Sequence, residues 1–265
     1  MTDLPSLLVT GSAGGLGREL VPRLRAAGHR VRCLDLQHPE GAGAEAVTGS
    51  VTDPQVVEAA LAGVDAVVHL GGISREAAWA DVLDTNVHGT WVLLDACARL
   101  GVGKVVFASS NHAVGLTPRP ADGSALPADA EPRPDSYYGW SKTAGESLCR
   151  LFAERAGLDV VSVRIGSCFE RPGDVRGLAT WMSYDDCRRL VSAAVDPAVT
   201  GWHSVWGISR NTRRWWSLAE GEAIGYHPQD DSERFAEQVL ADADPDEVVD
   251  LVGGSFTANA LGRPN

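Results

Sequence analysis

The sequence predicts an α/β protein of the Rossmann type, a doubly wound parallel sheet with helices on both faces. Two observations support this fold class. Short apolar runs alternate with helix-like segments over the first 165 residues, and a glycine-rich turn directly follows the first apolar run. Strands that alternate with helices at this spacing form parallel sheets. Ligands of such sheets bind beyond the carboxyl ends of the strands, so we expect the functional site there.

The predicted strands are the short apolar runs. They cover residues 7–10, 30–36, 66–70, 104–109 and 159–165. Gly11, Asp35, Leu70, Ser110 and Ile165 all fall at the carboxyl ends of these runs. The carboxyl ends of parallel strands share one edge of the sheet, so these five residues are predicted to border a single crevice.

Helices are predicted between the strands, at residues 16–27, from residue 54 onward, at 76–100 and at 137–156. Asp53 and Pro54 mark a helix start, because a capping side chain precedes proline at the first helical position. Gly28 and Gly157 end the first and last of these helices. The stretch from 117 to 136 is rich in proline, alanine and aspartate, which predicts an irregular surface loop.

The alternation of strands and helices weakens after about residue 170. We expect one domain over residues 1–265, in which residues from about 170 to 265 form a small cap over the crevice. Five tryptophans crowd this part of the chain: Trp181, Trp202, Trp206, Trp215 and Trp216. Their side chains are predicted to pack against one another rather than to contact a cofactor.

Composition narrows the possible partners and the cellular location. The 265 residues carry a net charge of -12, which disfavours nucleic acid and anionic membranes and means that an anionic substrate needs a local positive site. The five cysteines are dispersed and form no C-x-x-C pair, which argues against a zinc site or a disulfide framework. No segment resembles a signal peptide or a membrane span, so we expect a soluble, cytoplasmic protein.

The turn Gly11-Ser12-Ala13-Gly14-Gly15-Leu16-Gly17 lies between a predicted strand and a predicted helix. That context predicts dinucleotide binding, because glycines allow close approach and a helix N-terminus attracts the pyrophosphate. A purely structural turn is the alternative. Asp35 lies 18 residues past Gly17 and would accept hydrogen bonds from ribose hydroxyls and repel a 2′-phosphate, which favours NAD over NADP. A surface carboxylate is the alternative for Asp35, and strand alternation does not decide whether Arg32 faces the cofactor.

Tyr138 and Lys142 stand four residues apart in a predicted helix, so they share one face. An ammonium group near a phenol favours the phenolate, and an activated tyrosine beside a nucleotide loop suggests hydride transfer at an alcohol carbon. Ser110 ends the preceding predicted strand, where its hydroxyl could reach the same substrate oxygen. Tyr137 does not fit this pattern because residue 141 is serine. An ordinary exposed helix pair is the alternative.

From spacing alone, two further residues are interpreted as structural rather than functional. Arg176 lies beyond the last predicted strand, where a surface arginine is the better interpretation, although arginine pairs well with carboxylates. His112 follows Ser110 on the same loop and is interpreted as a structural histidine rather than a base.

Longer stretches carry a family resemblance. They are Leu8-Val9-Thr10-Gly11, His69-Leu70-Gly71-Gly72-Ile73-Ser74, Phe107-Ala108-Ser109-Ser110-Asn111-His112, Tyr138-Gly139-Trp140-Ser141-Lys142, Val163-Arg164-Ile165-Gly166-Ser167-Cys168, Thr180-Trp181, Val205-Trp206-Gly207 and Gly253-Gly254-Ser255-Phe256. With these stretches the chain resembles the extended short-chain dehydrogenase/reductase superfamily, and within it the bacterial uronate dehydrogenases. The resemblance runs nearly end to end.

The resemblance implies oxidation of D-glucuronate or D-galacturonate at C1 by NAD, giving an aldarolactone. It assigns Tyr138 as the catalytic base, Ser110 as its hydroxyl partner and Lys142 to the nicotinamide ribose and the tuning of Tyr138. It raises Arg176 to the anchor of the uronate carboxylate. The implied substrate contacts are Ser74, Ser110, Asn111, His112, Tyr138, Ser167, Arg176 and Phe256. The implied cofactor contacts are Gly11, Gly14, Gly15, Leu16, Gly17, Asp35, Leu36, Ser50, Val51, Leu70, Gly71, Gly72, Asn86, Tyr138, Lys142, Ile165 and Cys168.

Some of these assignments carry a qualification. Asn86 matches an asparagine that supports the lysine through water, and Cys168 faces the cofactor and is not expected to be a nucleophile. Two residues depart from the family pattern: Ser50 replaces an acidic residue near the adenine, and Gly15 replaces a bulkier one.

Two other functions stay open as alternatives. A nucleotide-sugar epimerase or dehydratase is disfavoured because a nucleotide diphosphate needs a larger basic lobe than the short C-terminal region offers. A non-catalytic dinucleotide-sensing protein has no need for Ser110, Tyr138 and Lys142 together. A homo-oligomer is expected, because members of the superfamily often associate through helices that flank the tyrosine.

Overall fold

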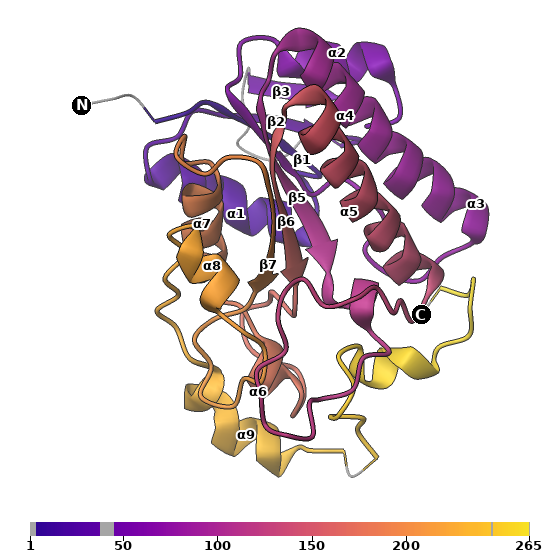
Figure 1. Cartoon of the computed structure of the whole chain (residues 1–265), viewed down its shortest axis with the longest axis vertical. Helices are drawn as coiled ribbons and strands as arrows, with labels where there is room; N and C mark the ends of the chain where they lie inside the picture. The colour runs from indigo at the N-terminus through magenta and orange to yellow at the C-terminus, as the bar shows by residue number, and fades with distance from the viewer. Residues whose placement is uncertain (1–3, 38–44, 245, 265) are drawn as a thin grey trace.

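The centre of the molecule is a seven-stranded sheet in which all strands run parallel, with the order β3-β2-β1-β4-β5-β6-β7 (Figure 1). The computed structural model describes residues 4–37, 45–244 and 246–264. The strands are β1 (Leu7–Thr10), β2 (Val31–Asp35), β3 (Ala46–Thr48), β4 (Ala66–His69), β5 (Lys104–Ser110), β6 (Asp159–Ile165) and β7 (Trp202–Gly207). The strand order reverses between β1 and β4, and ligands of doubly wound sheets bind at such a switch point. The predicted fold class is confirmed.

Helices cover both faces of the sheet (Figure 1). They are α1 (Gly15–Ala26), α2 (Pro54–Leu61), α3 (Trp79–Val82), the π-helical turn η2 (Leu83–His88), α4 (Gly89–Leu100), α5 (Tyr137–Ala156), α6 (Gly177–Thr180), α7 (Tyr184–Ala194), α8 (Ala219–Ala223) and α9 (Ala236–Ala241). The 3₁₀ turns are η3 (Asn111–Val114), η4 (Ser232–Phe235) and η5 (Gly254–Ala258). Helices α1 and α7 pack on one face, and α2, α4 and α5 on the other.

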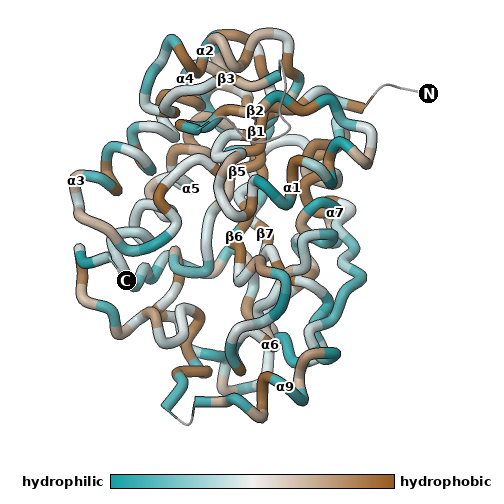
Figure 2. The backbone as a smooth tube through the Cα atoms, turned by 180° about the vertical axis from the view of Figure 1, so that it is seen from behind, coloured by the Kyte–Doolittle hydropathy of each residue, from teal (hydrophilic) through white to brown (hydrophobic). Residues whose placement is uncertain are grey.

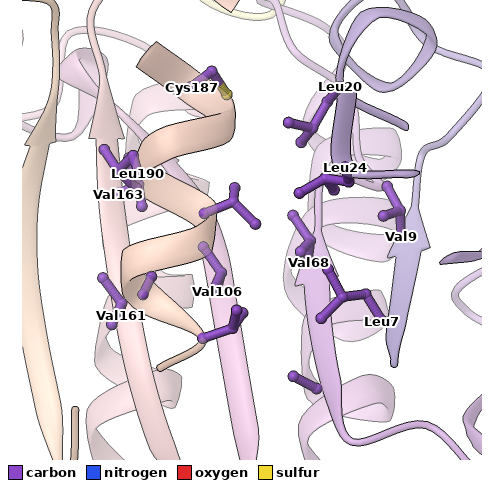
Figure 3. Packing of buried hydrophobic residues seen from close by; sticks show 14 of the residues in the cluster. Leu7, Val9, Leu20, Leu24, Val68, Val106, Val161, Val163, Cys187 and Leu190 are labelled. Atoms are coloured by element: carbon purple, nitrogen blue, oxygen red, sulfur yellow. The ribbon is translucent and has the colours of Figure 1, made fainter. Parts of the chain in front are cut away.

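The core forms because side chains alternate across each strand. Leu7 and Val9 point toward Leu20 and Leu24 of α1, as Figure 3 shows, whereas Leu8 between them belongs to the cluster under α2 and α4. In Figure 2 the central strands are mostly brown, which reflects burial on both faces. No helix among the described residues is long and apolar enough to cross a membrane.

The structure differs from the predicted elements in three places. Residues 76–100 are not one helix but α3, η2 and α4, and the helical part begins only at Trp79. β7 and α7 were not predicted; β7 pairs with β6 and α7 packs on the sheet, so residues 184–207 extend the Rossmann layers instead of forming part of a cap. The sequence of β7 includes His203 and Ser204, which interrupt the apolar run that predicts a buried strand. The three-residue edge strand β3 was missed as well.

The remaining C-terminal segments gather beyond the carboxyl ends of the strands, where α6 and α9 lie in Figure 1. A third hydrophobic cluster holds this region together. Trp206 and Trp216 stack with ring centroids 4.2 Å apart, and Trp215 meets Trp216 edge-on at 5.7 Å. Trp181 packs edge-on against Phe235, and Trp202 packs against the cluster under α2 and α4. The predicted packing role of the tryptophans is confirmed, although only three of the five contact one another. Residues 117–136 contain no helix and no strand, as expected.

Candidate active site

The glycine turn after β1 is built for close approach of backbone. Gly11 has a φ of +68°, and a Cβ there would lie 2.8 Å from the Gly71 nitrogen. A Cβ on Gly17 would lie 2.3 Å from the Gly11 carbonyl oxygen. No side chain caps α1 at Gly14, and no acidic residue occupies its first turn. The positive end of α1 is therefore open toward an anion, so these residues fit a dinucleotide pyrophosphate.

Asp35 holds this turn in place at the end of β2. One carboxylate oxygen accepts a hydrogen bond from the Ala13 nitrogen at 2.8 Å, and the other accepts from Gln37 at 3.3 Å. A carboxylate has about four acceptor positions, so Asp35 can also receive ribose hydroxyls. Arg32 points elsewhere, because its guanidinium donates to the carbonyls of Ala60 and Ala62 in and after α2.

The structure shows what surrounds Gly15 and Ser50, the two residues that differ from the family pattern. A Cβ on Gly15 would meet nothing within 4 Å, so the turn has room for a bulkier residue there. The Ser50 hydroxyl lies 2.8 Å from the Thr52 hydroxyl and accepts a hydrogen bond from the Thr52 nitrogen. Val51 is buried beside them, while Leu36 is 70% exposed at the mouth of the crevice.

Tyr138, Ser110 and Lys142 come together where β5 ends and α5 begins. The Ser110 hydroxyl lies close enough to the Tyr138 phenol to lower its pKa. The Lys142 ammonium lies 5.7 Å from the centre of the Tyr138 ring and donates to the Ala108 carbonyl at 2.8 Å. The structure thus assembles the predicted trio at one end of the sheet.

The acid–base properties of the trio differ from the prediction. Burial raises the pKa of Tyr138 to about 12; the Ser110 hydrogen bond lowers it and the Asp135 charge raises it. Burial also lowers the pKa of Lys142 to about 8. In the protein without its cofactor, desolvation has the largest effect on the pKa of Tyr138, and the Lys142 ammonium donates to a carbonyl. The tuning of Tyr138 by Lys142 stays a prediction.

Asn86 supports the surroundings of Lys142 from the π-helical turn η2. Its side chain accepts from the Ile73 nitrogen at 2.7 Å and donates to the Ile73 carbonyl and to the Ser141 hydroxyl. A Cβ on Gly72 would lie 2.9 Å from the Asn86 oxygen and 4.0 Å from the Lys142 nitrogen. Gly72, Asn86 and Lys142 therefore lie side by side, and π-helical turns are frequent at functional sites.

Hydrogen bonds join three of the predicted sugar contacts: Arg176, Asn111 and Ser110. Arg176 donates to the Val252 carbonyl at 3.1 Å, and the Asn111 amide donates to the same carbonyl at 3.0 Å. The Ser110 hydroxyl donates to the Asn111 oxygen at 3.4 Å, and Ser110 in turn lies beside Tyr138. The structure brings Arg176 to the same site as the tyrosine.

Arg176 is not the surface arginine that spacing alone favoured. Burial lowers the pKa of its guanidinium, against the raising effects of Asp174, Glu247 and Asp135. No carboxylate in the described part of the chain lies within ion-pair distance of this guanidinium, although Glu247 accepts from its backbone nitrogen at 2.6 Å. A partly buried cation without a paired anion fits an anionic ligand.

Phe256 and His112 close the site from the C-terminal side. Their ring centroids are 4.1 Å apart, and the His112 ring meets the Tyr138 ring edge-on at 5.8 Å. The Nδ1 atom of His112 donates to Asp135 at 2.7 Å, which fixes the orientation of the imidazole. His112 therefore has the structural partner that was expected, and its ring lies against the predicted base.

The other predicted residues border the crevice. Ser167 lies 3.3 Å from the Thr180 hydroxyl, which also accepts from Arg176. Leu16, Leu70, Ile165 and Cys168 are partly buried and pack against the core cluster under α1 and α7. Ser74 lies exposed on the loop after β4. The pKa of Cys168 is raised well above its usual value by a hydrogen bond with Cys187 and by burial, which does not favour a nucleophilic thiolate.

Sequence reasoning missed three buried residues of the site: His69, Glu76 and Asp135. His69 lies between the hydroxyls of Thr10, at 2.7 Å, and Thr90, at 3.2 Å, and burial lowers its pKa to about 3. Thr10 also accepts from the Gly71 nitrogen, so a neutral His69 links the cofactor loops of β1 and β4.

The two missed carboxylates lie around the start of α5. Asp135 is enclosed by backbone, since a Cβ on Gly115 or Gly253 would lie 1.8 or 2.1 Å from its oxygen. Glu76 accepts from the Tyr138 nitrogen at 3.0 Å. No motif marks either residue. The signal available in the sequence was only that Glu76 lies two residues past Ser74 and Asp135 three residues before Tyr138.

Comparison with known proteins places the chain in a family. Residues 7–182 match the model of the NAD dependent epimerase/dehydratase family. The chain therefore belongs to that family, which confirms at this level the predictions of an oxidoreductase and of NAD as its cofactor.

Similarity to individual proteins extends over nearly the whole chain. It is 37% identical to a uronate dehydrogenase of Pseudomonas putida, with 97% of each chain covered. A crystal structure of a mutant uronate dehydrogenase from Agrobacterium tumefaciens, complexed with NAD, superposes with a TM-score of 0.91 at 36% identity, covering 99% of this chain and 100% of that one. The resemblance to uronate dehydrogenases is thus confirmed. A Haloferax volcanii protein named NAD-dependent glucose-6-phosphate dehydrogenase is 39% identical over 88% of this chain and 96% of its own.

Proposed function

We propose that this protein oxidises a hexuronic acid, D-glucuronate or D-galacturonate, at C1 with NAD and releases the aldarolactone. The observation that carries the proposal is Arg176, a partly buried guanidinium without an ion-pair partner among the described residues, in a protein of net charge -12. A substrate carboxylate would supply the missing anion, and arginine binds carboxylates through two parallel hydrogen bonds. The hydrogen bonds of Arg176 and Asn111 to the Val252 carbonyl support this proposal, because Asn111 also accepts from Ser110, the proposed partner of Tyr138.

In this proposal Tyr138 removes the proton from the anomeric hydroxyl as hydride leaves C1, and Ser110 orients that oxygen. Bound NAD supplies the hydride acceptor and a positively charged nicotinamide. A positive charge near the phenol lowers its pKa, which opposes the effect of burial on Tyr138. Lys142 binds the nicotinamide ribose and adds a second positive charge, since a pKa of about 8 leaves it mostly protonated at neutral pH.

The proposed preference for NAD over NADP comes from Asp35 and Arg32. A carboxylate at the end of β2 repels a 2′-phosphate. Arg32, the nearby cation, is bonded to carbonyls of the α2 region and lies 3.5 Å from Glu45, so it is turned away from the expected ribose position.

The test is NADH formation, followed by absorbance. D-glucuronate and D-galacturonate are compared with D-glucose 6-phosphate, and NAD with NADP. We expect rapid turnover of at least one uronate with NAD. Turnover of the sugar phosphate but of neither uronate would reject the proposal and reassign Arg176 to a phosphate.

Tyr138→Phe tests the proposed base. General-base catalysis contributes roughly 10²- to 10⁴-fold, so kcat should fall by that factor while the dissociation constant for NADH, measured by fluorescence, stays within about twofold. A variant with near-normal kcat would show that another group takes the proton.

The expected homo-oligomer and cytoplasmic location stay predictions. Light scattering on the purified protein measures the first of them.

A further inference from the structure

Glu76 is a fully buried carboxylate between three parts of the molecule. It lies on the loop after β4, two residues past Ser74. Its Oε2 atom accepts from the Tyr138 nitrogen at 3.0 Å, and its Oε1 atom accepts from the Tyr137 nitrogen at 3.3 Å. Oε1 also accepts from the Gly262 nitrogen at 2.6 Å, so the C-terminal tail meets the same side chain. Tyr137 is the first residue of α5, and Figure 1 shows the C-terminal tail near that end of the helix.

This carboxylate is held by backbone and not by a cation. Among the described residues it forms no ion pair, and burying a charge is costly unless hydrogen bonds satisfy it. The N-terminus of the 20-residue helix α5 supplies both N–H donors and a favourable dipole.

The start of α5 depends on this arrangement. The first turn of a helix leaves its N–H groups without partners inside the helix. The Ser136 hydroxyl accepts from Gly139, and the Ser136 carbonyl accepts from Trp140. Glu76 accepts from the two preceding residues, one of which is Tyr138 itself. The backbone of the proposed base is therefore fixed by a side chain from another loop.

The tail that reaches Glu76 also covers the sugar site. Phe256 in η5 packs on His112, and Gly262 follows six residues later. A Cβ on Gly262 would lie 3.3 Å from the Tyr137 ring, so the tail contacts the start of α5 through packing as well.

We infer that Glu76 is a positioning residue for Tyr138, and that it couples the placement of the C-terminal tail to the placement of the base. The inference rests on the proposed role of Tyr138. A glutamate offers two acceptor oxygens to the three N–H groups, whereas a glutamine offers one acceptor oxygen and an amide that cannot accept. Glu76→Gln therefore has to lose either the bond to Tyr138 or the bonds to Tyr137 and Gly262, in a side chain of the same size.

The experiment measures kcat, KM and NADH affinity for Glu76→Gln, for the chain ended after Ala260, and for the two changes combined. Small displacements of a catalytic group cost up to about 10²-fold in rate, so we expect Glu76→Gln to lower kcat by about tenfold or more. NADH affinity should stay within about twofold. We expect the shortened chain to show a smaller decrease in kcat than Glu76→Gln. In the combined variant the fold-decrease in kcat should be smaller than the product of the two single fold-decreases, because both changes act on one network. Glu76→Asp, which keeps two acceptor oxygens, should recover part of kcat.

Asp65→Asn is the matched control. The Asp65 carboxylate also accepts two hydrogen bonds, from the nitrogen and hydroxyl of Ser6, but at the opposite edge of the sheet. This variant should lower Tm without a change in kcat. If Glu76→Gln lowers Tm but keeps the wild-type kcat, Glu76 is only structural and the inference is rejected. If the fold-decrease in kcat of the combined variant equals the product of the two single fold-decreases, the coupling to the tail is rejected.

Hydrogen exchange keeps this test separate from the proposed function. Amide exchange at residues 137–140 should be faster in Glu76→Gln and in the shortened chain than in the full chain. If the wild-type protein turns over no uronate, the proposed function fails, while faster exchange still supports the positioning by Glu76. Unchanged exchange in both variants overturns the inference whether or not the protein is active.

Discussion

The two halves of the proposed site, called here the cofactor half and the substrate half, are built by different means. The cofactor half is formed by segments that are close in the sequence. Gly11 and Gly17 belong to one turn, and Asp35 accepts a hydrogen bond from Ala13 of that turn, 22 positions earlier. In the substrate half, Asn111 reaches Val252 across 141 positions and Arg176 reaches the same carbonyl across 76. One half follows from a local motif, and the other exists only after the whole chain has folded.

This difference affects which groups interact with a ligand. The cofactor half offers mostly backbone: glycines without side chains and an uncapped helix end. The substrate half offers a charged side chain held against a carbonyl, with Phe256 and His112 packed beside it. Substitutions in the first half should therefore act through space for backbone, and substitutions in the second through charge.

Arg176→Met should give the largest effect that is confined to the substrate half. Truncating one member of a buried, hydrogen-bonded charge pair costs about 2–4 kcal/mol, which corresponds to a rise in KM for the uronate of roughly 30- to 1,000-fold. Tm should not fall, because the substitution removes a buried cation that has no ion-pair partner in the described structure. Steady-state kinetics and thermal unfolding measure the two quantities.

Arg171→Met is the control for that variant. Arg171 lies exposed on the same loop, where it contacts Gln238 at 3.4 Å. Its loss should leave KM for the uronate unchanged. An equal rise in KM for both variants would mean that the loop attracts the substrate by general charge, and that Arg176 is not its anchor.

Gly17→Ala should act on the cofactor half with a somewhat smaller effect. Its Cβ would lie 2.3 Å from the Gly11 oxygen and 2.7 Å from the Ser12 Cα, so the backbone of the turn has to move. Overpacking of this kind costs about 1–3 kcal/mol, and we expect NADH affinity to fall by roughly 10- to 100-fold. Fluorescence titration measures the affinity.

Gly103→Ala provides the comparison for Gly17→Ala. A Cβ on Gly103 meets nothing within 4 Å, and this residue precedes β5 at the amino edge of the sheet. NADH affinity should not change there. If Gly17→Ala also binds NADH normally, the turn is only a structural connection, which was the alternative considered from the sequence.

Much of the cofactor half could be predicted from the sequence, for physical reasons. A turn that requires glycine at positions 11 and 17 can be recognised in the sequence, and so can the apolar runs of β1, β4 and β5. The sequence signal of β7 is weaker because polar residues interrupt its apolar run, and β3 is too short for a periodic pattern.

The substrate half could not be predicted from spacing. Arg176 looks like a surface residue until Val252 and Asn111 lie beside it, and only the family resemblance pointed to it. Asp135 and Glu76 were missed because a buried carboxylate is recognised by its partners. Those partners, such as His112 for Asp135 and Gly262 for Glu76, are backbone groups or side chains brought close by folding.

Asp135→Asn is expected to have the smallest effect on kcat of the substitutions considered. It tests whether a carboxylate near the sugar contacts influences the proposed base, Tyr138. The Asp135 charge raises the pKa of Tyr138, so its removal should lower that pKa. The rate depends on a Tyr138 that can take a proton, and kcat should therefore rise with pH at a lower pH in the variant than in the wild-type protein. The pH profile of kcat, measured with saturating NAD and uronate, gives the midpoint.

The sign of this shift separates an electrostatic role from a packing role. Asparagine has nearly the size of aspartate, so it fits the space between Gly115 and Gly253, and its oxygen can still accept from His112. Loss of packing would lower kcat at every pH and leave the midpoint in place. A midpoint that moves to higher pH would contradict the electrostatic effect of Asp135 on Tyr138, since removal of a negative charge near a phenol can only favour its phenolate.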